Sequence, residues 1–304
     1  MFFVIEKYRF KDIEQVLILY HILRKTMFNI ANLLTGMNLI CGMLSILFCF
    51  SGKLDFAVYA IFLGAMFDFA DGFVARKFNL TSDLGKQLDS LSDLITFCVA
   101  PGFLMFFMII LGIDSSALIE ASSKGQTFYD YYVLQEFFTW VNAVFYHVPN
   151  KFDASIKWLP FIAFLIPFCG LFRLAKFNID TRQKQDFIGF PTPLTAIIFS
   201  FFPLYFALHL KNWSNEVELI RLSFDCYSLS FIVLLFSSLM LSPISLMSLK
   251  INKMNPRENQ LKLFFILISA VSIPFFKVLS IPFILTLYFI VSIYHSFKIT
   301  KDEI

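Results

Sequence analysis

Long apolar runs recur along the chain and restrict its fold more than any other feature. A helix of roughly 20 apolar residues crosses the hydrocarbon core of a bilayer. Of the 304 residues, 58% are hydrophobic and only 15% are charged, a mixture far from that of a soluble domain. We predict an all-α polytopic membrane protein with about eight transmembrane helices, the seventh short for a full crossing, at residues 28–50, 55–75, 84–112, 158–177, 191–210, 224–249, 263–276 and 279–297.

The positions of the Lys and Arg residues predict how these helices are oriented. With the N-terminus in the cytoplasm, 18 of the 25 basic residues fall on the cytoplasmic side and 7 on the opposite side. Cytoplasmic loops of membrane proteins are enriched in Lys and Arg. The distribution favours eight spans in a cytoplasmic membrane, with both chain ends in the cytoplasm.

Segments outside these spans carry patterns of their own. Residues 1–27 place apolar side chains at helical spacing beside charged ones, which predicts an interfacial helix; a cap helix in the cytosol fits the same pattern. Residues 113–157 are rich in Tyr, Phe and Trp, which favours an extracytoplasmic insertion at the lipid interface, with a structural lid or dimer contact as alternatives. A C-terminal helical hairpin is predicted at 251–304, after a membrane core at 28–250.

The net charge and the cysteines predict neither a nucleic-acid-binding site nor a metal site built from cysteines. The net charge of +3 is small, and no nucleic-acid partner is predicted. The cysteines form neither a CxxC pair nor a metal-site spacing, so we predict that they pack as small apolar side chains. They are Cys41, Cys49, Cys98, Cys169 and Cys226.

Four aspartates interrupt the second and third predicted spans. A charge at the centre of a membrane helix costs about 2.5 to 3.5 kcal/mol on insertion scales. Asp68 and Asp71 are three residues apart and Asp89 and Asp93 are four apart, so each pair lies on one helix face. A short connection between the helices would bring the pairs together near the cytoplasmic surface. Such a cluster of oxygen ligands suits two Mg²⁺ or Mn²⁺ ions, which stabilise attacking and leaving oxygens in phosphoryl transfer.

Small and basic residues between the acids favour a phosphate-bearing ligand. Gly72 and Ala75 remove bulk from a helix face that adjoins the acids, and Gly85 leaves room before the second pair. Arg76 offers a planar fork for phosphate oxygens. Taken singly, small residues also mark close helix packing, and isolated intramembrane acids also make structural hydrogen bonds or line ion pathways.

Together the acids and their neighbours form the pattern D-x2-D-G-x2-A-R-x8-G-x3-D-x3-D at residues 68–93. This pattern resembles the signature of the CDP-alcohol phosphotransferase family at every fixed position. The resemblance implies a homodimeric integral membrane enzyme with a six-helix core, to which this chain adds two helices. It also implies transfer of a phosphoalcohol group from a CDP-linked donor to a hydroxyl group, with release of CMP.

The resemblance implies a role for each signature residue. The four acids would hold the divalent ions, and Asp93 would also be the general base for the acceptor hydroxyl. The cytidine end of the donor would lie against Gly72, Ala75 and Gly85, with its diphosphate on Arg76.

Sequence blocks around the signature look like the phosphatidylserine synthase branch of this family. The blocks lie at residues 29–42, 88–102, 172–178, 187–196 and 242–250. This branch implies CDP-diacylglycerol and L-serine as substrates, handled at the membrane lipid surface. Within the family, acceptors such as glycerol 3-phosphate or inositol and an archaetidylserine-type donor are the alternatives.

Polar residues in these blocks are candidates for substrate contacts. Asn32 and Thr35 are predicted to hydrogen-bond nucleotide or phosphate, whereas Asn38, deeper in the span, fits a helix–helix contact equally well. Arg173 and Asn178 are predicted to bind serine, with a lipid headgroup as the alternative. Two further classes of protein place acids inside membranes, namely ion or proton transporters and aspartate-rich prenyltransferases, but neither requires the D-G-x2-A-R run.

Overall fold

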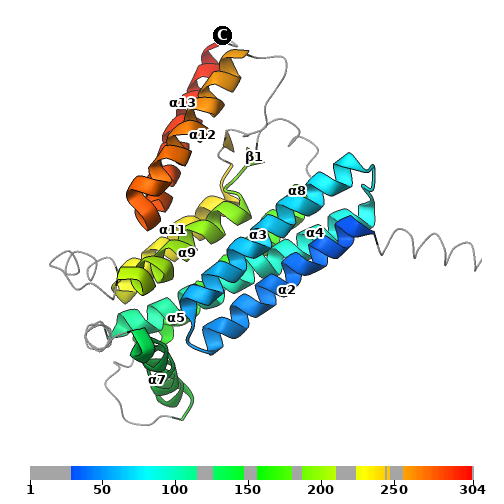
Figure 1. Ribbon diagram of the computed structural model, residues 1–304. Helices are drawn as coiled ribbons and strands as arrows, with labels where there is room; N and C mark the ends of the chain where they lie inside the picture. Colours follow the sequence, from blue (N-terminus) through cyan, green and yellow to red (C-terminus); the bar gives the residue numbers. More distant parts are fainter. Residues whose placement is uncertain are drawn as a thin grey trace, which may run out of the picture.

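The structure is a computed structural model that describes residues 29–114, 126–146, 156–179, 187–209, 224–243, 245–246 and 256–302. The interfacial helix predicted at residues 1–27 lies outside these ranges. Within them the chain is almost wholly helical (Figure 1). The elements are α2 (Ile30–Phe50), α3 (Leu54–Lys77), α4 (Asp83–Leu94), η1 (Ile95–Val99), α5 (Ala100–Ile113), α7 (Gln126–Phe145), η2 (Ile156–Phe164), α8 (Leu165–Ile179), β1 (Phe187–Ile188), α9 (Thr192–His209), α11 (Cys226–Leu241), β2 (Ser245–Leu246), α12 (Pro256–Phe276), η3 (Lys277–Leu279) and α13 (Ser280–Asp302).

Each predicted span coincides with an apolar helix, which confirms the all-α polytopic membrane class. Four helical segments in the described ranges are long and apolar enough to cross a bilayer, namely Ile30–Phe50, Leu54–Lys77, Asp83–Ile113 and Ile156–Ile179. Four shorter apolar helices follow at Thr192–Phe206, Cys226–Leu241, Leu263–Phe275 and Ser280–Ser292. The sixth span was predicted at 224–249, but its helix, α11, ends at Leu241. Ser242, the residue before Pro243, has an extended backbone that stops the helix.

A two-residue antiparallel ladder joins β1 to β2. Phe187 pairs with Leu246, and Ile188 pairs with Ser245. The ladder was not predicted, and it ties the chain before α9 to the chain after α11.

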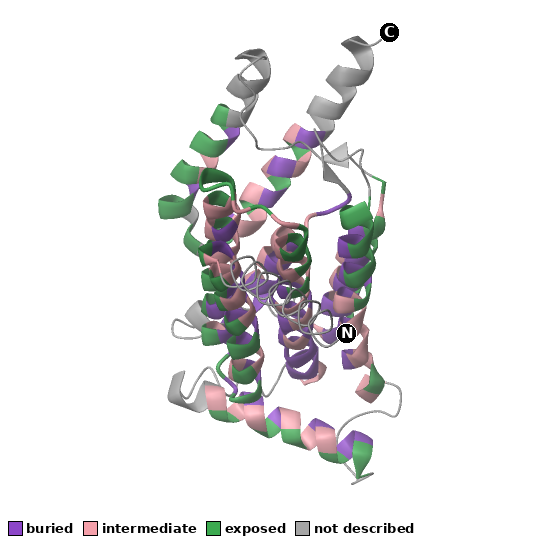
Figure 2. Ribbon diagram, turned by 90° about the vertical axis from the view of Figure 1, so that its right-hand side faces the viewer, coloured by how far each residue is buried: buried purple, intermediate pink, exposed green. Residues whose placement is uncertain are grey.

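Helix α5 forms the centre of the bundle. Every residue from Ala100 to Gly112 is buried except Phe103. The outer helices α2 and α3 instead expose large apolar side chains, among them Leu33 and Phe69, as expected of a surface covered by lipid. Figure 2 shows buried residues concentrated between the helices and exposed ones on the outer faces. All five cysteines are buried and free of disulfides, as predicted.

Helix α7 lies across one end of the bundle instead of along it (Figures 1 and 2). This aromatic-rich helix makes up most of the described part of the segment predicted as an insertion at 113–157. Its start packs on the turn between α2 and α3, where a Cβ on Gly52 would lie 2.5 Å from the Asp130 carbonyl oxygen. Trp140 Nε1 donates to the Lys157 carbonyl at 2.8 Å, which ties α7 to η2.

A tight turn between α3 and α4 sets the two acid-bearing helices side by side. Asn79 has a left-handed backbone (φ 52°), and the Leu80 N–H donates to the Ala75 carbonyl at 2.9 Å. This pattern terminates α3 with a Schellman motif, in which Asn is a favoured residue after Gly. Ser82 then caps α4, because its hydroxyl accepts from the Gly85 N–H at 3.0 Å.

Glycines allow α2 and α3 to pack closely against the third span. A Cβ on Gly42 would lie 2.6 Å from Thr96 Oγ1 and 2.8 Å from Thr96 Cα. A Cβ on Gly64 would lie 2.6 Å from Thr96 Cγ2. Thr96 therefore occupies space that any larger residue on either helix would take.

We expect Gly42→Ala to destabilise the protein by roughly 1–3 kcal/mol, because the added methyl group meets backbone and forces the helices apart. Thermal unfolding in detergent would measure the effect. Gly36→Ala on the same helix is the matched control, since no atom lies within 4 Å of a Cβ there. Equal stability of the two variants would contradict the packing explanation.

Candidate active site

The α3–α4 hairpin brings three of the four predicted metal ligands together. Carboxylate oxygens of Asp68, Asp71 and Asp89 lie within 4.8 Å of one another. Asp68 and Asp89 are close enough to share a hydrogen bond, and Asp89 Oδ1 is buried with no partner among the described residues. Two carboxylates this close require a proton or a cation between them.

Asp93 lies one helical turn further along, outside this group of three. It is near enough for electrostatic interaction with all three. Its Oδ1 accepts from Asn38 Nδ2 at 3.2 Å. The structure therefore separates three clustered acids from a fourth held by an amide.

Thr35 contacts the acid cluster directly. Its Oγ1 lies 2.5 Å from Asp71 Oδ2, and donation to a charged acceptor is the stronger of its options. Asp71 is buried, with 5% of its surface exposed. Thr35 was predicted to contact nucleotide or phosphate; the structure places its hydroxyl on Asp71, at the edge of a pocket.

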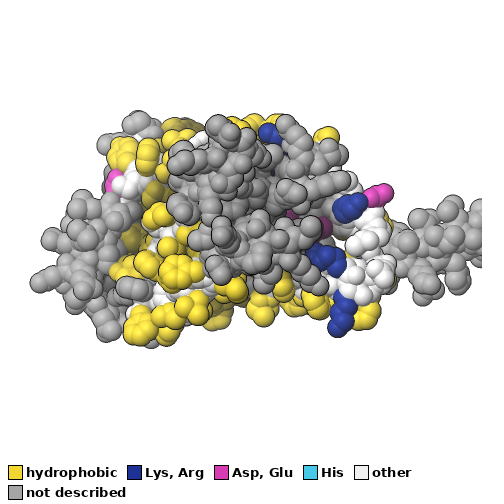
Figure 3. All heavy atoms as spheres, turned by 90° about the horizontal axis from the view of Figure 1, so that it is seen from above, with side chains coloured by type: hydrophobic (Ala, Val, Ile, Leu, Met, Phe, Trp, Pro, Cys, Tyr) yellow, Lys and Arg dark blue, Asp and Glu magenta, His cyan; other side chains and the backbone are white. Residues whose placement is uncertain are grey.

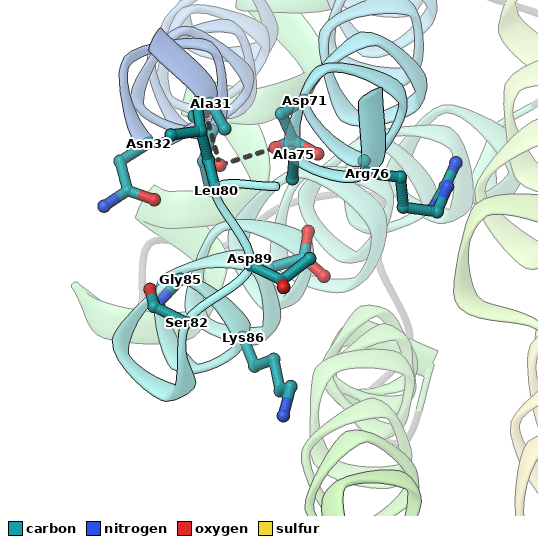
Figure 4. Close-up of a pocket in the computed structure, with 13 residues that line it drawn as sticks. Ala31, Asn32, Asp71, Ala75, Arg76, Leu80, Ser82, Gly85, Lys86 and Asp89 are labelled. Carbon is teal, nitrogen blue, oxygen red and sulfur yellow. Dashed lines mark hydrogen bonds between the residues drawn. The ribbon is translucent and has the colours of Figure 1, made fainter. Parts of the chain in front are cut away.

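A pocket of about 160 Å³ opens beside the acids (Figure 4). Figure 4 shows Asn32 and Arg76 on opposite sides, with Asp71 and Asp89 between them. A Cβ on Gly85 would lie 3.3 Å from Asn32 Oδ1, so this glycine keeps the wall open. The lining consists of Ala31, Asn32, Thr35, Asp71, Gly72, Ala75, Arg76, Leu80, Thr81, Ser82, Gly85, Lys86 and Asp89.

Arg173 and Asn178 lie on α8, outside the lining of this pocket. Arg173 is 8% exposed; its Nη1 donates to Thr192 Oγ1 at 3.2 Å, and its Nε is buried without a partner among the described residues. Asn178 Nδ2 donates to Ser90 Oγ at 2.9 Å. Ser90 follows Asp89 directly, so both α8 residues lie next to the acid-bearing helix.

Several residues around the site were not singled out from the sequence. Ser82 and Lys86 line the pocket, and Ser92 and Thr96 bind backbone carbonyls of α2. Ser92 and Thr96 are four residues apart, as Asp89 and Asp93 are, so they also share one helix face. This spacing was the available signal.

The fold and the site define an integral membrane enzyme in which an acidic cluster adjoins a pocket suited to phosphate. The family of CDP-alcohol phosphatidyltransferases matches residues 28–122. The chain is 31% identical over 180 residues to the CDP-diacylglycerol–serine O-phosphatidyltransferase of Bacillus subtilis, covering 56% of this chain and 76% of that protein. The chain belongs to the CDP-alcohol phosphatidyltransferase family, as the signature predicted.

Two further relatives cover more of this chain. The archaetidylserine synthase of Methanothermobacter thermautotrophicus is 29% identical over 215 residues, which are 70% of this chain and 67% of that protein. The CDP-diacylglycerol–serine O-phosphatidyltransferase of Helicobacter pylori is 28% identical over 248 residues, 81% of either chain.

We expect Thr35→Val to weaken binding of Mn²⁺ by about 10- to 100-fold, because groups that orient metal ligands contribute this much to affinity. Paramagnetic resonance of Mn²⁺ titrated into purified protein would measure it. Thr286→Val is the control, since that exposed hydroxyl donates to the Pro282 carbonyl within α13. Unchanged Mn²⁺ affinity in Thr35→Val would contradict a role for this hydroxyl at the acid cluster.

Proposed function

We propose that this protein is a phosphatidylserine synthase, which transfers the phosphatidyl group of CDP-diacylglycerol to the hydroxyl of L-serine and releases CMP. The main support for the reaction type is that carboxylate oxygens of Asp68, Asp71 and Asp89 lie within 4.8 Å of one another. They adjoin a pocket that Arg76 lines. The acceptor rests on the relatives, since those of Bacillus subtilis and Helicobacter pylori are named for serine.

The residues at the site fit a divalent cation. Carboxylates are the hard oxygen ligands that Mg²⁺ and Mn²⁺ prefer, and Asp89 Oδ1 is buried without a hydrogen-bond partner among the described residues. Asp68, Asp71 and Asp89 would hold the ions, with Asp93 as the fourth acid. When bound, two such ions neutralise charge on the phosphate oxygens and on the departing CMP.

The chain's own residues account for binding and for proton transfer. Gly72 and Gly85 leave space for the donor, and Arg76 binds its diphosphate. The serine oxygen forms a bond to the phosphorus next to diacylglycerol, while the bond from that phosphorus to the CMP oxygen breaks and CMP takes the electron pair. The hydroxyl proton passes to Asp93, since a positioned carboxylate can accept a proton from an alcohol that is otherwise a poor nucleophile.

Arg173 is our candidate for the serine carboxylate. Its guanidinium is almost fully buried and interacts electrostatically with Asp93. Its Nε donates to no residue in the described part of the chain. A buried, unpaired donor favours an anionic ligand, and Arg binds carboxylates through two parallel hydrogen bonds. Asn178, bonded to Ser90, would accept from the serine ammonium group.

The archaeal relative favours the same acceptor with a different donor. This relative is named archaetidylserine synthase, so its name shares serine with the names of the bacterial relatives. In this proposal the acids and Arg76 meet the donor at its diphosphate, so they do not select between diacyl and archaeal lipid tails. The second candidate is therefore a change of donor lipid at the same site.

We place the active site at the cytoplasmic face of a cytoplasmic membrane. The acids lie near the end of the α3–α4 hairpin, where Arg76, Lys77 and Lys86 are exposed. Basic residues mark the cytoplasmic ends of spans. On the face shown in Figure 3, most of the visible Lys and Arg side chains gather at one end of the molecule. A homodimer, as in the family, completes the proposal.

Purified protein given CDP-diacylglycerol, Mn²⁺ and a panel of alcohols should release CMP with L-serine and with no other acceptor above background. Chromatography of CMP would follow the reaction. Release of CMP with glycerol 3-phosphate or inositol, but not with serine, would overturn the assignment of serine as the acceptor. The reaction type would still stand. No release with any alcohol would overturn both.

We expect Arg173→Gln to raise the KM for serine at least tenfold, because one charge-assisted pair contributes about 1.5–3 kcal/mol. The KM for CDP-diacylglycerol should stay within about twofold, as the pocket that Arg76 lines is untouched. Lys176→Gln, an exposed neighbour on α8, is the control. A raised KM for the lipid with an unchanged KM for serine would assign Arg173 to a lipid headgroup instead.

A further inference from the structure

Asn38 is a fully buried amide in the middle of the bundle, one helical turn beyond Thr35 on α2. Its exposed fraction is 0%. Burying an amide without hydrogen bonds costs roughly 2–7 kcal/mol, depending on the reference state. Its Nδ2 donates to Asp93 Oδ1 at 3.2 Å, across 55 positions of sequence. The amide therefore hydrogen-bonds to Asp93, the acid that lies outside the cluster of three carboxylates.

Chemistry determines which atom of the Asn38 amide faces Asp93. An ionised carboxylate can only accept, so it requires the NH₂ group of the amide. The amide oxygen turns instead toward α3, where a Cβ on Gly64 would lie 3.0 Å from Oδ1. A larger residue than glycine at that position would push the amide away from Asp93.

Two backbone contacts hold Asp93 opposite Asn38. Ser92 Oγ donates to the Thr35 carbonyl at 3.0 Å, and Thr96 Oγ1 donates to the Asn38 carbonyl at 2.9 Å. These hydroxyls lie on either side of Asp93 in the sequence. The backbone around the acid is thus bound to the same turn of α2 that carries the amide.

We propose that Asn38 is a positioning residue for Asp93: it holds Oδ1 and leaves Oδ2 to receive the proton of the acceptor alcohol. The described part of the chain supplies Asn38 as the side-chain donor to Asp93, at Oδ1. A neutral donor fixes the carboxylate without adding a cation that would compete with bound metal ions. The inference rests on the proposed function, in which Asp93 is the base.

The test compares Asn38→Ala with Asn38→Ser in steady-state CMP release. Both variants shorten the side chain by a similar amount, but serine keeps a hydroxyl from which one water can bridge to Asp93. We expect Asn38→Ala to lower kcat on the order of 100-fold, the cost of misplacing a catalytic group by about 1 Å. The kcat of Asn38→Ser should be about tenfold higher than that of Asn38→Ala.

The KM values for both substrates should stay within about twofold in both variants. Ser45→Ala, at another fully buried polar residue of α2, is the control and should keep the wild-type kcat. If Asn38→Ala does not fold, Asn38→Cys replaces it, since a thiol of similar size to the serine hydroxyl donates only weakly.

Equal kcat values for the alanine and serine variants would overturn the proposal, as would a wild-type kcat in Asn38→Ala. A loss that appears mainly in the KM for the lipid would also overturn it, by assigning Asn38 to binding. If the wild-type protein uses another alcohol, the serine assignment fails and the same comparison is made with that alcohol. The two proposals can therefore fail separately.

Discussion

Repulsion between carboxylates inside an apolar bundle is the constraint on which the rest of the structure depends. Asp68, Asp71 and Asp89 lie within 4.8 Å of one another, and burial weakens the solvent screening that separates such charges in water. An arrangement of this kind persists only if the surroundings supply donors, protons or cations. The polar groups of the bundle gather accordingly, with Thr35 on Asp71 and Asn38 on Asp93. Both donors come from one face of α2, which makes this helix as much a part of the site as the acid-bearing hairpin.

The parts that could be predicted from the sequence follow from local periodicity. Membrane helices appear as apolar runs, and pairs of acids three or four residues apart share a helix face. Together with a short connection between two helices, these rules predict one cluster of all four acids with Arg76 nearby. The structure groups Asp68, Asp71 and Asp89 and leaves Asp93 one turn away. The fixed spacing of the signature also identified the family, which the comparison with known proteins confirmed.

The contacts that could not be predicted join residues far apart in the sequence. Thr35 and Asp71 are 36 positions apart, and nothing in either local pattern selects one for the other. Asn38 was equally compatible with a simple helix contact until its distance to Asp93 was known. The direction of α7 across the end of the bundle could not be predicted either, because a high content of aromatic residues indicates a lipid interface but not the direction of a helix. Side-chain partners across helices depend on how the helices rotate and slide against each other, which periodicity leaves open.

The π-helical turn η1 (Ile95–Val99) follows Asp93 within the third span. It precedes Pro101, which has no N–H to donate to the carbonyl four residues earlier. A π turn contains about one residue more than an α turn, and one residue corresponds to about 100° of rotation around a helix. The turn therefore offsets the angular phase of α5 from that of α4. One half of the span can aim its acids at α2 and α3 while the other half aims apolar side chains into the core. One continuous helix therefore presents two differently oriented faces, one for the chemistry of the site and one for the packing of the bundle.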